Sequence, residues 1–126
     1  MSWEIEFEEC EDYLFVRVTG ENSRDTVFAY TQDMLHRCEE TGHNRVLIHE
    51  RLSGPRLSIV ELFGLLEEGS RRAMGKLQAI AFVDEDMGAT AEFAENVAVN
   101  RGMPMATFDN VDAAKAWLAG HGRNDA

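Results

Sequence analysis

The chain has 126 residues, of which 44% are hydrophobic and 28% charged. This composition is typical of one globular domain with a core of its own. The net charge of −11 argues against general binding to nucleic acid or to an anionic membrane, because both partners attract basic surfaces. No apolar run approaches the roughly 20 residues of a membrane-spanning helix, and the N-terminus does not resemble a signal peptide. We therefore expect no membrane insertion and a cytoplasmic location.

The two cysteines lie far apart in the sequence and belong to no CxxC pattern. Cys10 and Cys38 are therefore unlike the ligands of a zinc knuckle or a thioredoxin-like redox pair. We expect both to remain reduced thiols.

The first half of the chain predicts two strands and a helix. Residues 3–8 alternate between large apolar side chains and glutamates, which is the pattern of a strand with one wet face. Residues 13–19 predict its antiparallel partner. A helix follows, with Ser23 or Asp25 as the N-cap and Gly42 at its end. Its apolar face carries Val27, Tyr30, Met34 and Cys38.

The second half alternates strands and helices. We predict strands over residues 46–49, 77–83 and 105–108, and helices from about residue 59, over 90–101, and from residue 109 or 110 to 120. The resulting order ββαβαβαβα predicts an α/β domain over residues 1–120. Its sheet has about five strands, mostly parallel, with an antiparallel N-terminal edge strand, and four helices accompany it. The tail 121–126 is expected to fray.

A charged segment separates the third predicted strand from the helix that follows. Ser58 can cap this helix, because Glu61 three residues later completes a capping box. Leu57 and Leu62 have the spacing of a hydrophobic staple. This arrangement favours a structural role for Ser58.

The same junction is a candidate binding site. Ligands of open α/β sheets lie at the carboxyl ends of parallel strands, against the amides of helix N-termini. Glu50, Arg51 and Arg56 occupy such a position beside Ser58. The two arginines either bind an anion or pair with surface carboxylates, and the sequence leaves both interpretations open. Residues 84–86 (Asp-Glu-Asp) could face Glu50 and hold a hard cation, although acidic residues after a strand are more often turn residues. No catalytic triad is identifiable, and we expect neither a metal nor a covalent cofactor.

The order of elements resembles that of the STAS domain, whose fold is shared by the sporulation SpoIIAA proteins. The segments "ERLSGPRLS", "EEGSRRAMGKLQAIAFVDE" and "AVNRGMP" resemble a bacterial family of small STAS-like proteins of uncharacterised function, often grouped with the CRAL-TRIO fold. The resemblance places Glu50 at the acidic residue that ends the strand in anti-sigma-factor antagonists. Ser58 lies near their phosphorylated serine, but "LSIVELFG" replaces their DSSG-type motif.

Three functional hypotheses follow. The first is a non-enzymatic STAS-like module that binds a partner protein or a small anionic ligand through Glu50, Arg51, Arg56 and Ser58. The second is a carrier of an apolar, lipid-like ligand between the sheet and the helix over 57–66, and the third is a small enzyme with an unrecognised site. The apolar face of the strand over 3–8 also predicts a homodimer.

Overall fold

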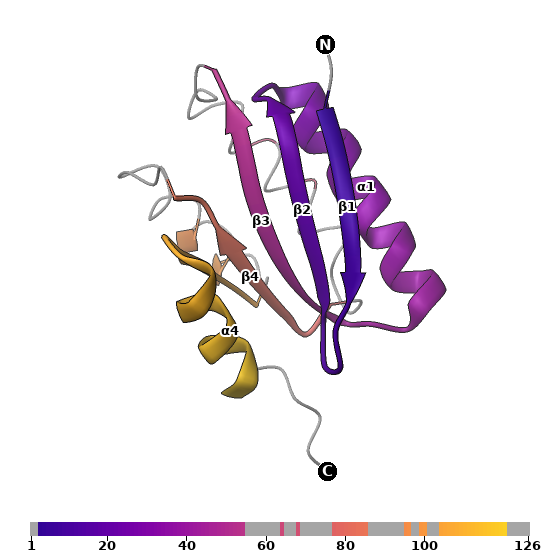
Figure 1. The fold of residues 1–126 in the computed structure, drawn as a ribbon, viewed down its shortest axis with the longest axis vertical. Coiled ribbons are helices and arrows are strands. Elements are labelled where there is room, and N and C mark those ends of the chain that lie inside the picture. Colours follow the sequence, from indigo (N-terminus) through magenta and orange to yellow (C-terminus); the bar gives the residue numbers. More distant parts are fainter. Residues whose placement is uncertain are drawn as a thin grey trace.

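We analysed a computed structural model, which describes residues 3–54, 64, 68, 77–85, 95–96, 99–100 and 104–120. In Figure 1, the helix over Arg24–Thr41 lies on one face of the sheet and the helix over Val111–Gly120 on the other. The elements are β1 (Trp3–Glu9), β2 (Leu14–Glu21), α1 (Arg24–Thr41), β3 (Arg45–Ser53), β4 (Ala79–Val83), β5 (Met105–Phe108) and α4 (Val111–Gly120).

The five strands form one mixed sheet in the order β1-β2-β3-β4-β5. The β1–β2 pair is antiparallel, and the pairs β2–β3, β3–β4 and β4–β5 are parallel. This arrangement confirms the mostly parallel sheet with an antiparallel strand at the N-terminal edge.

Of the four expected helices, the first and last are described as α1 and α4. The other two, from about residue 59 and over 90–101, fall mainly outside the described residues, although positions 64, 68, 95–96 and 99–100 are helical. The tail 121–126 lies outside them entirely. In the part of the chain that the structure describes, no helix is long and apolar enough to span a membrane.

The capping residues of α1 follow the sequence expectation. Ser23 is the N-cap, and its side chain accepts a hydrogen bond from the backbone N–H of Thr26 at 3.1 Å. Gly42 ends the helix in the left-handed conformation, with φ of 81°, and its N–H donates to the carbonyl of Cys38 at 2.8 Å. The helix is therefore fixed at both ends by local contacts.

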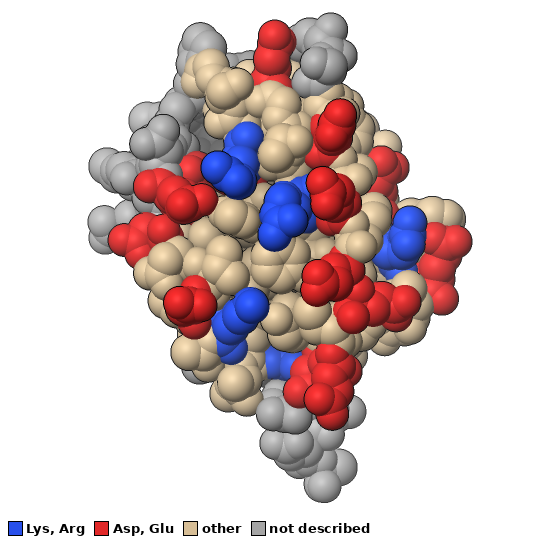
Figure 2. Space-filling model, viewed as in Figure 1, with Lys and Arg blue, Asp and Glu red and all other residues tan. Residues whose placement is uncertain are grey.

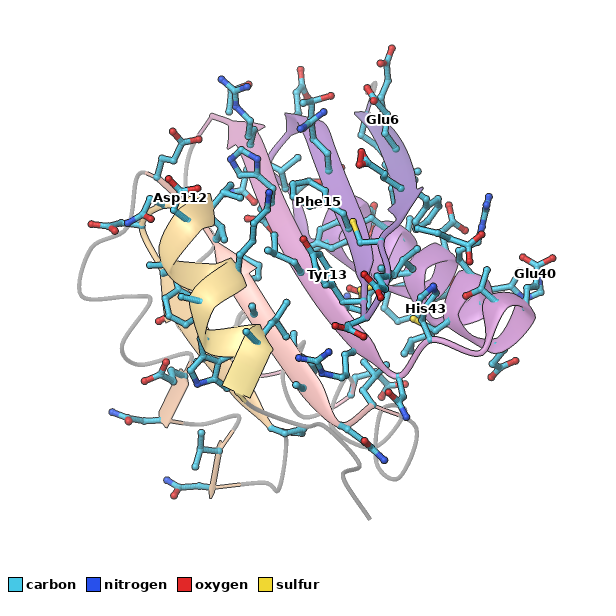
Figure 3. All side chains as sticks on the ribbon, turned by 60° about the horizontal axis from the view of Figure 1, so that its bottom comes forward. Glu6, Tyr13, Phe15, Glu40, His43 and Asp112 are labelled. Atoms are coloured by element: carbon cyan, nitrogen blue, oxygen red, sulfur yellow. The ribbon has the colours of Figure 1, made fainter. Side chains whose placement is uncertain are left out.

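Side chains alternate between two cores along the strands. The core under α1 contains Leu14, Val16 and Val18 of β2 and Val46 and Ile48 of β3, packed with Tyr30, Met34, Leu35 and Cys38 of the helix. The core under α4 is smaller and contains Leu47, Ala79, Ala81 and Val83 with Ala114 and Leu118. Phe15, labelled in Figure 3, packs against this second core from β2. The strands β2 to β5 therefore contribute to both cores, whereas β1 packs only against the core under α1.

Both cysteines are free thiols. Cys38 is 6% exposed, and its burial raises the pKa of the thiol to about 11. This thiol stays protonated at neutral pH and acts as part of the core.

Candidate functional site

The third strand is longer than the sequence predicts. The prediction ended it at His49, but β3 continues to Ser53 and pairs with β2 from Leu14↔Val46 to Glu21↔Ser53. Its pairing with β4 ends earlier, at His49↔Val83. Residues 50–53 therefore project beyond the end of β4, and we call this segment the β3 overhang. Glu50 and Arg51 lie within a strand and not in a turn after it.

Glu50 lies on the α1 face of the sheet. Its Oε2 accepts a hydrogen bond from the hydroxyl of Tyr30, in the middle of α1. Tyr30 is 2% exposed, and its pKa is raised well above the usual value, first by burial and then by the negative charge of Glu50. The phenol therefore remains a proton donor, and it fixes the carboxylate against the helix.

Arg51 lies on the opposite face, beside His49 and Glu85. His49 Nε2 lies 2.8 Å from Glu85 Oε1, and Arg51 Nε lies 3.9 Å from the same oxygen. The side chains of Arg51 and Glu85 are each 60% exposed, whereas that of His49 is 11% exposed. Among the described residues, His49 Nδ1 is buried without a hydrogen-bond partner. The ring packs edge-on against Phe15, with centroids 6.4 Å apart.

The structure therefore separates the two described members of the predicted site. Successive residues of a strand point to opposite faces, so Glu50 and Arg51 have different neighbours. Arg56 and Ser58 lie outside the described residues, as does the helix over 57–66 proposed to cover an apolar ligand, except for position 64.

Three residues that were not among the predicted site residues, Tyr30, His49 and Glu85, also lie at this end of the sheet. Tyr30 has the spacing of a core residue, and nothing in the pattern distinguishes its hydroxyl from others. His49 and Glu85 become neighbours only through the register of β3 with β4. The sequence signal was the acidic run 84–86 after a strand, which was expected to face Glu50. Glu85 instead contacts His49 and Arg51 on the other face.

The described residues contain no group of three or more His, Cys, Asp or Glu side chains that could hold a metal ion. Of the acidic run 84–86, Glu85 contacts His49 on the face opposite Glu50, whereas burial, then the charge of Glu50 and then that of Asp84 raise the pKa of Tyr30. Residue 86 lies outside the described residues.

No family model matches the chain, and no curated protein matches it in sequence. Solved structures do match it. An uncharacterised protein of the DUF3478 family with a SpoIIAA-like fold, from Shewanella loihica PV-4, superposes with a TM-score of 0.57 at 18% identity, over 92% of this chain and 93% of that one. A serine-to-glutamate variant of Moorella thermoacetica RsbS superposes with a TM-score of 0.58 at 19% identity, over 91% of this chain and 94% of that one. Identities this low establish the fold alone. The chain has the SpoIIAA-like fold of STAS domains, as the sequence resemblance predicted.

Proposed function

We propose that this protein is a non-enzymatic STAS-like module that binds a partner protein through the carboxyl end of β3. The β3 overhang carries the proposal, because Arg51 lies at the carboxyl end of a parallel strand, the end at which open α/β sheets bind their ligands. Arg51 and Glu85 are both well exposed there and offer opposite charges to a partner. Arg56 and Ser58 follow within seven residues and complete the proposed surface.

The charges favour a partner protein over a small anion. Among the described residues near the overhang, three carboxylates (Glu50, Asp84 and Glu85) outnumber the guanidinium of Arg51, and the charge balance stays negative when Arg56 of the proposed surface is added. A free anion would be repelled by this balance. A protein surface can present a carboxylate to Arg51 and a cation to Glu85 at once, which makes such a mixed pair a source of specificity.

The proposal is tested by site-specific photo-crosslinking in the native host. A photoreactive phenylalanine analogue replaces Arg51 or Glu85, and Asp112, an exposed residue of α4, is the matched control position. We expect an adduct of one defined mass from positions 51 and 85 and none from position 112. If no adduct forms, and inorganic phosphate at submillimolar concentration shifts the amide resonances of residues 49–53, the ligand of this site is a small anion and not a partner protein.

The double variant Arg51→Gln/Arg56→Gln should lose the adduct formed from position 85 while its melting temperature stays nearly unchanged. Exposed ion pairs contribute only about 0–1 kcal/mol to folding, so their loss should affect binding and not stability. A loss of more than about 2 kcal/mol in the free energy of unfolding would identify the arginines as structural braces.

Ser58→Ala is the matched comparison for this double variant. If Ser58 is a helix cap, the variant should lose about 1 kcal/mol of stability and keep most of its binding. Urea unfolding and the crosslinking yield separate these two outcomes.

A further inference from the structure

β1 forms an edge of the sheet. Within the described residues it pairs on one side only, with β2. The hairpin register fixes which backbone groups point away from β2. Cys10 N–H donates to the carbonyl of Tyr13 at 2.9 Å. Because hydrogen-bonded pairs alternate along an antiparallel ladder, the backbone groups of Glu8, Glu6 and Glu4 also point toward β2. The N–H and C=O groups of Ile5 and Phe7 therefore point outward along the edge.

The two faces of this edge differ in chemistry. Glu4, Glu6 and Glu8 are all exposed on the face opposite α1, and Figure 2 shows a column of acidic side chains over β1. Arg17 of β2 lies across from Glu6, with its Nη1 4.0 Å from the carboxylate. On this face, an added strand would meet carboxylates at every second residue.

The other face borders a groove of about 340 Å³ between β1 and α1. Ile5 and Phe7 of β1 and Asp33, His36, Arg37 and Glu40 of α1 line it. The Arg37 guanidinium lies over the Phe7 ring, 4.6 Å from its centroid, and its Nε is 3.9 Å from Glu40. The groove therefore combines an apolar strand face with a polar helical wall, directly beside the outward backbone groups.

We propose that β1 receives an extended segment of another protein, in which basic and apolar residues alternate, as a sixth strand. Side chains directly opposite each other on neighbouring strands share a face of the sheet. Residues opposite Glu4, Glu6 and Glu8 would therefore be lysine or arginine. The residues between them would be apolar and would enter the groove beside Ile5 and Phe7. The outward N–H and C=O groups would bond the backbone of the added segment.

A second copy of this chain fits the edge less well. If two β1 strands pair antiparallel about a twofold axis centred on Ile5, Glu4 of one copy stands opposite Glu6 of the other. If the axis passes through Glu6, Glu6 stands opposite itself and Glu4 opposite Glu8. Each register places like charges directly across from each other, which is destabilising. The glutamates therefore disfavour pairing of β1 with β1 of a second copy and favour pairing with a strand that carries basic residues.

The test uses the full chain and two synthetic peptides of the same composition, acetyl-KVKVKVK-amide and acetyl-KKKVVVK-amide. We expect the alternating peptide to bind at least about tenfold more tightly than the block peptide, as measured by calorimetry at low salt. Hydrogen exchange at the amides of Ile5 and Phe7 should slow by about tenfold or more in the complex, because these amides become bonded.

The matched variants remove three negative charges each. Glu4→Gln/Glu6→Gln/Glu8→Gln should weaken binding of the alternating peptide by about tenfold or more. Glu85→Gln/Asp109→Asn/Asp112→Asn, altered at exposed positions outside β1, β2 and α1, should stay within about twofold of the wild type. Equal affinity for the two peptides, or unchanged exchange at Ile5 and Phe7, would overturn the proposal. Protection of these amides in the wild-type protein without peptide, together with a dimeric mass, would assign the edge to a second copy.

Discussion

At the scale of single residues, the hydrogen bond between Tyr30 and Glu50 connects the middle of α1 to the β3 overhang. Tyr30→Phe removes the hydroxyl donor and leaves the partly buried carboxylate of Glu50 without this hydrogen bond. Hydrogen bonds to charged groups contribute about 1.5–3 kcal/mol, so we expect a loss of about 2 kcal/mol in urea unfolding at pH 8. Tyr13→Phe, which removes a phenol hydroxyl at a half-buried position of the other core, should cost less than about 1 kcal/mol.

The same pair predicts the alkaline limit of stability. The pKa of Tyr30 is raised in the folded protein, so the folded state holds this proton at pH values where the unfolded chain releases it. Its contribution to stability is complete below about pH 10, the ordinary pKa of tyrosine, and falls as the pH rises above it. The difference in unfolding free energy between the wild type and Tyr30→Phe should therefore shrink between pH 8 and pH 11. A constant difference over this range would contradict this assignment.

At the scale of elements, α1 depends on the cap at its N-terminus. Ser23→Ala removes the acceptor for the N–H of Thr26 and should lower the free energy of unfolding by about 1 kcal/mol. Ser23→Asp should restore most of this loss, because aspartate is a comparable cap and its charge suits the helix dipole. Thermal unfolding followed by circular dichroism measures both. If Ser23→Ala and Ser23→Asp have the same melting temperature, the side chain at position 23 makes no capping contribution to stability.

The end of β3 shows where the sequence pattern stopped being informative. The apolar run ends at Ile48, and "HERLSGP" has the composition of a turn. The strand continues because β2 offers partners up to Glu21, and because Tyr30 satisfies the carboxylate of Glu50 on the α1 face. Both reasons are tertiary contacts, made by residues about 20 or more positions away. Strand pairing therefore overrides local composition here.

At the scale of the whole molecule, the sheet and the faces of its helices could be predicted, because they depend on periodicity. The alternation over residues 3–8 predicted an antiparallel edge strand, and the spacing of Tyr30, Met34 and Cys38 predicted the buried face of α1. The site could not be predicted in the same way. The separation of Glu50 from Arg51, and the approach of Glu85 to His49, depend on where neighbouring strands end.

The charge of β1 also predicts how the molecule associates with itself. The homodimer expected from the sequence stays a prediction, and the register of β1 limits its form. If copies pair through this edge, Glu4→Gln/Glu6→Gln/Glu8→Gln should self-associate more strongly than the wild type, because opposed like charges become neutral. Sedimentation velocity over a range of concentrations measures the change. An unchanged dissociation constant would place any dimer contact elsewhere.

The strand order has a consequence for how the protein is made. Each strand of the sheet lies beside the strand that precedes it in the chain, from β1 to β5. During synthesis, every strand that leaves the ribosome therefore finds its neighbour already present, and no strand has to wait for a later one to be inserted beside it. Domains generally fold from the N-terminus as they emerge, at about 5–20 residues per second. This topology lets the nascent sheet grow by addition at a single edge, and α4 covers its second face last.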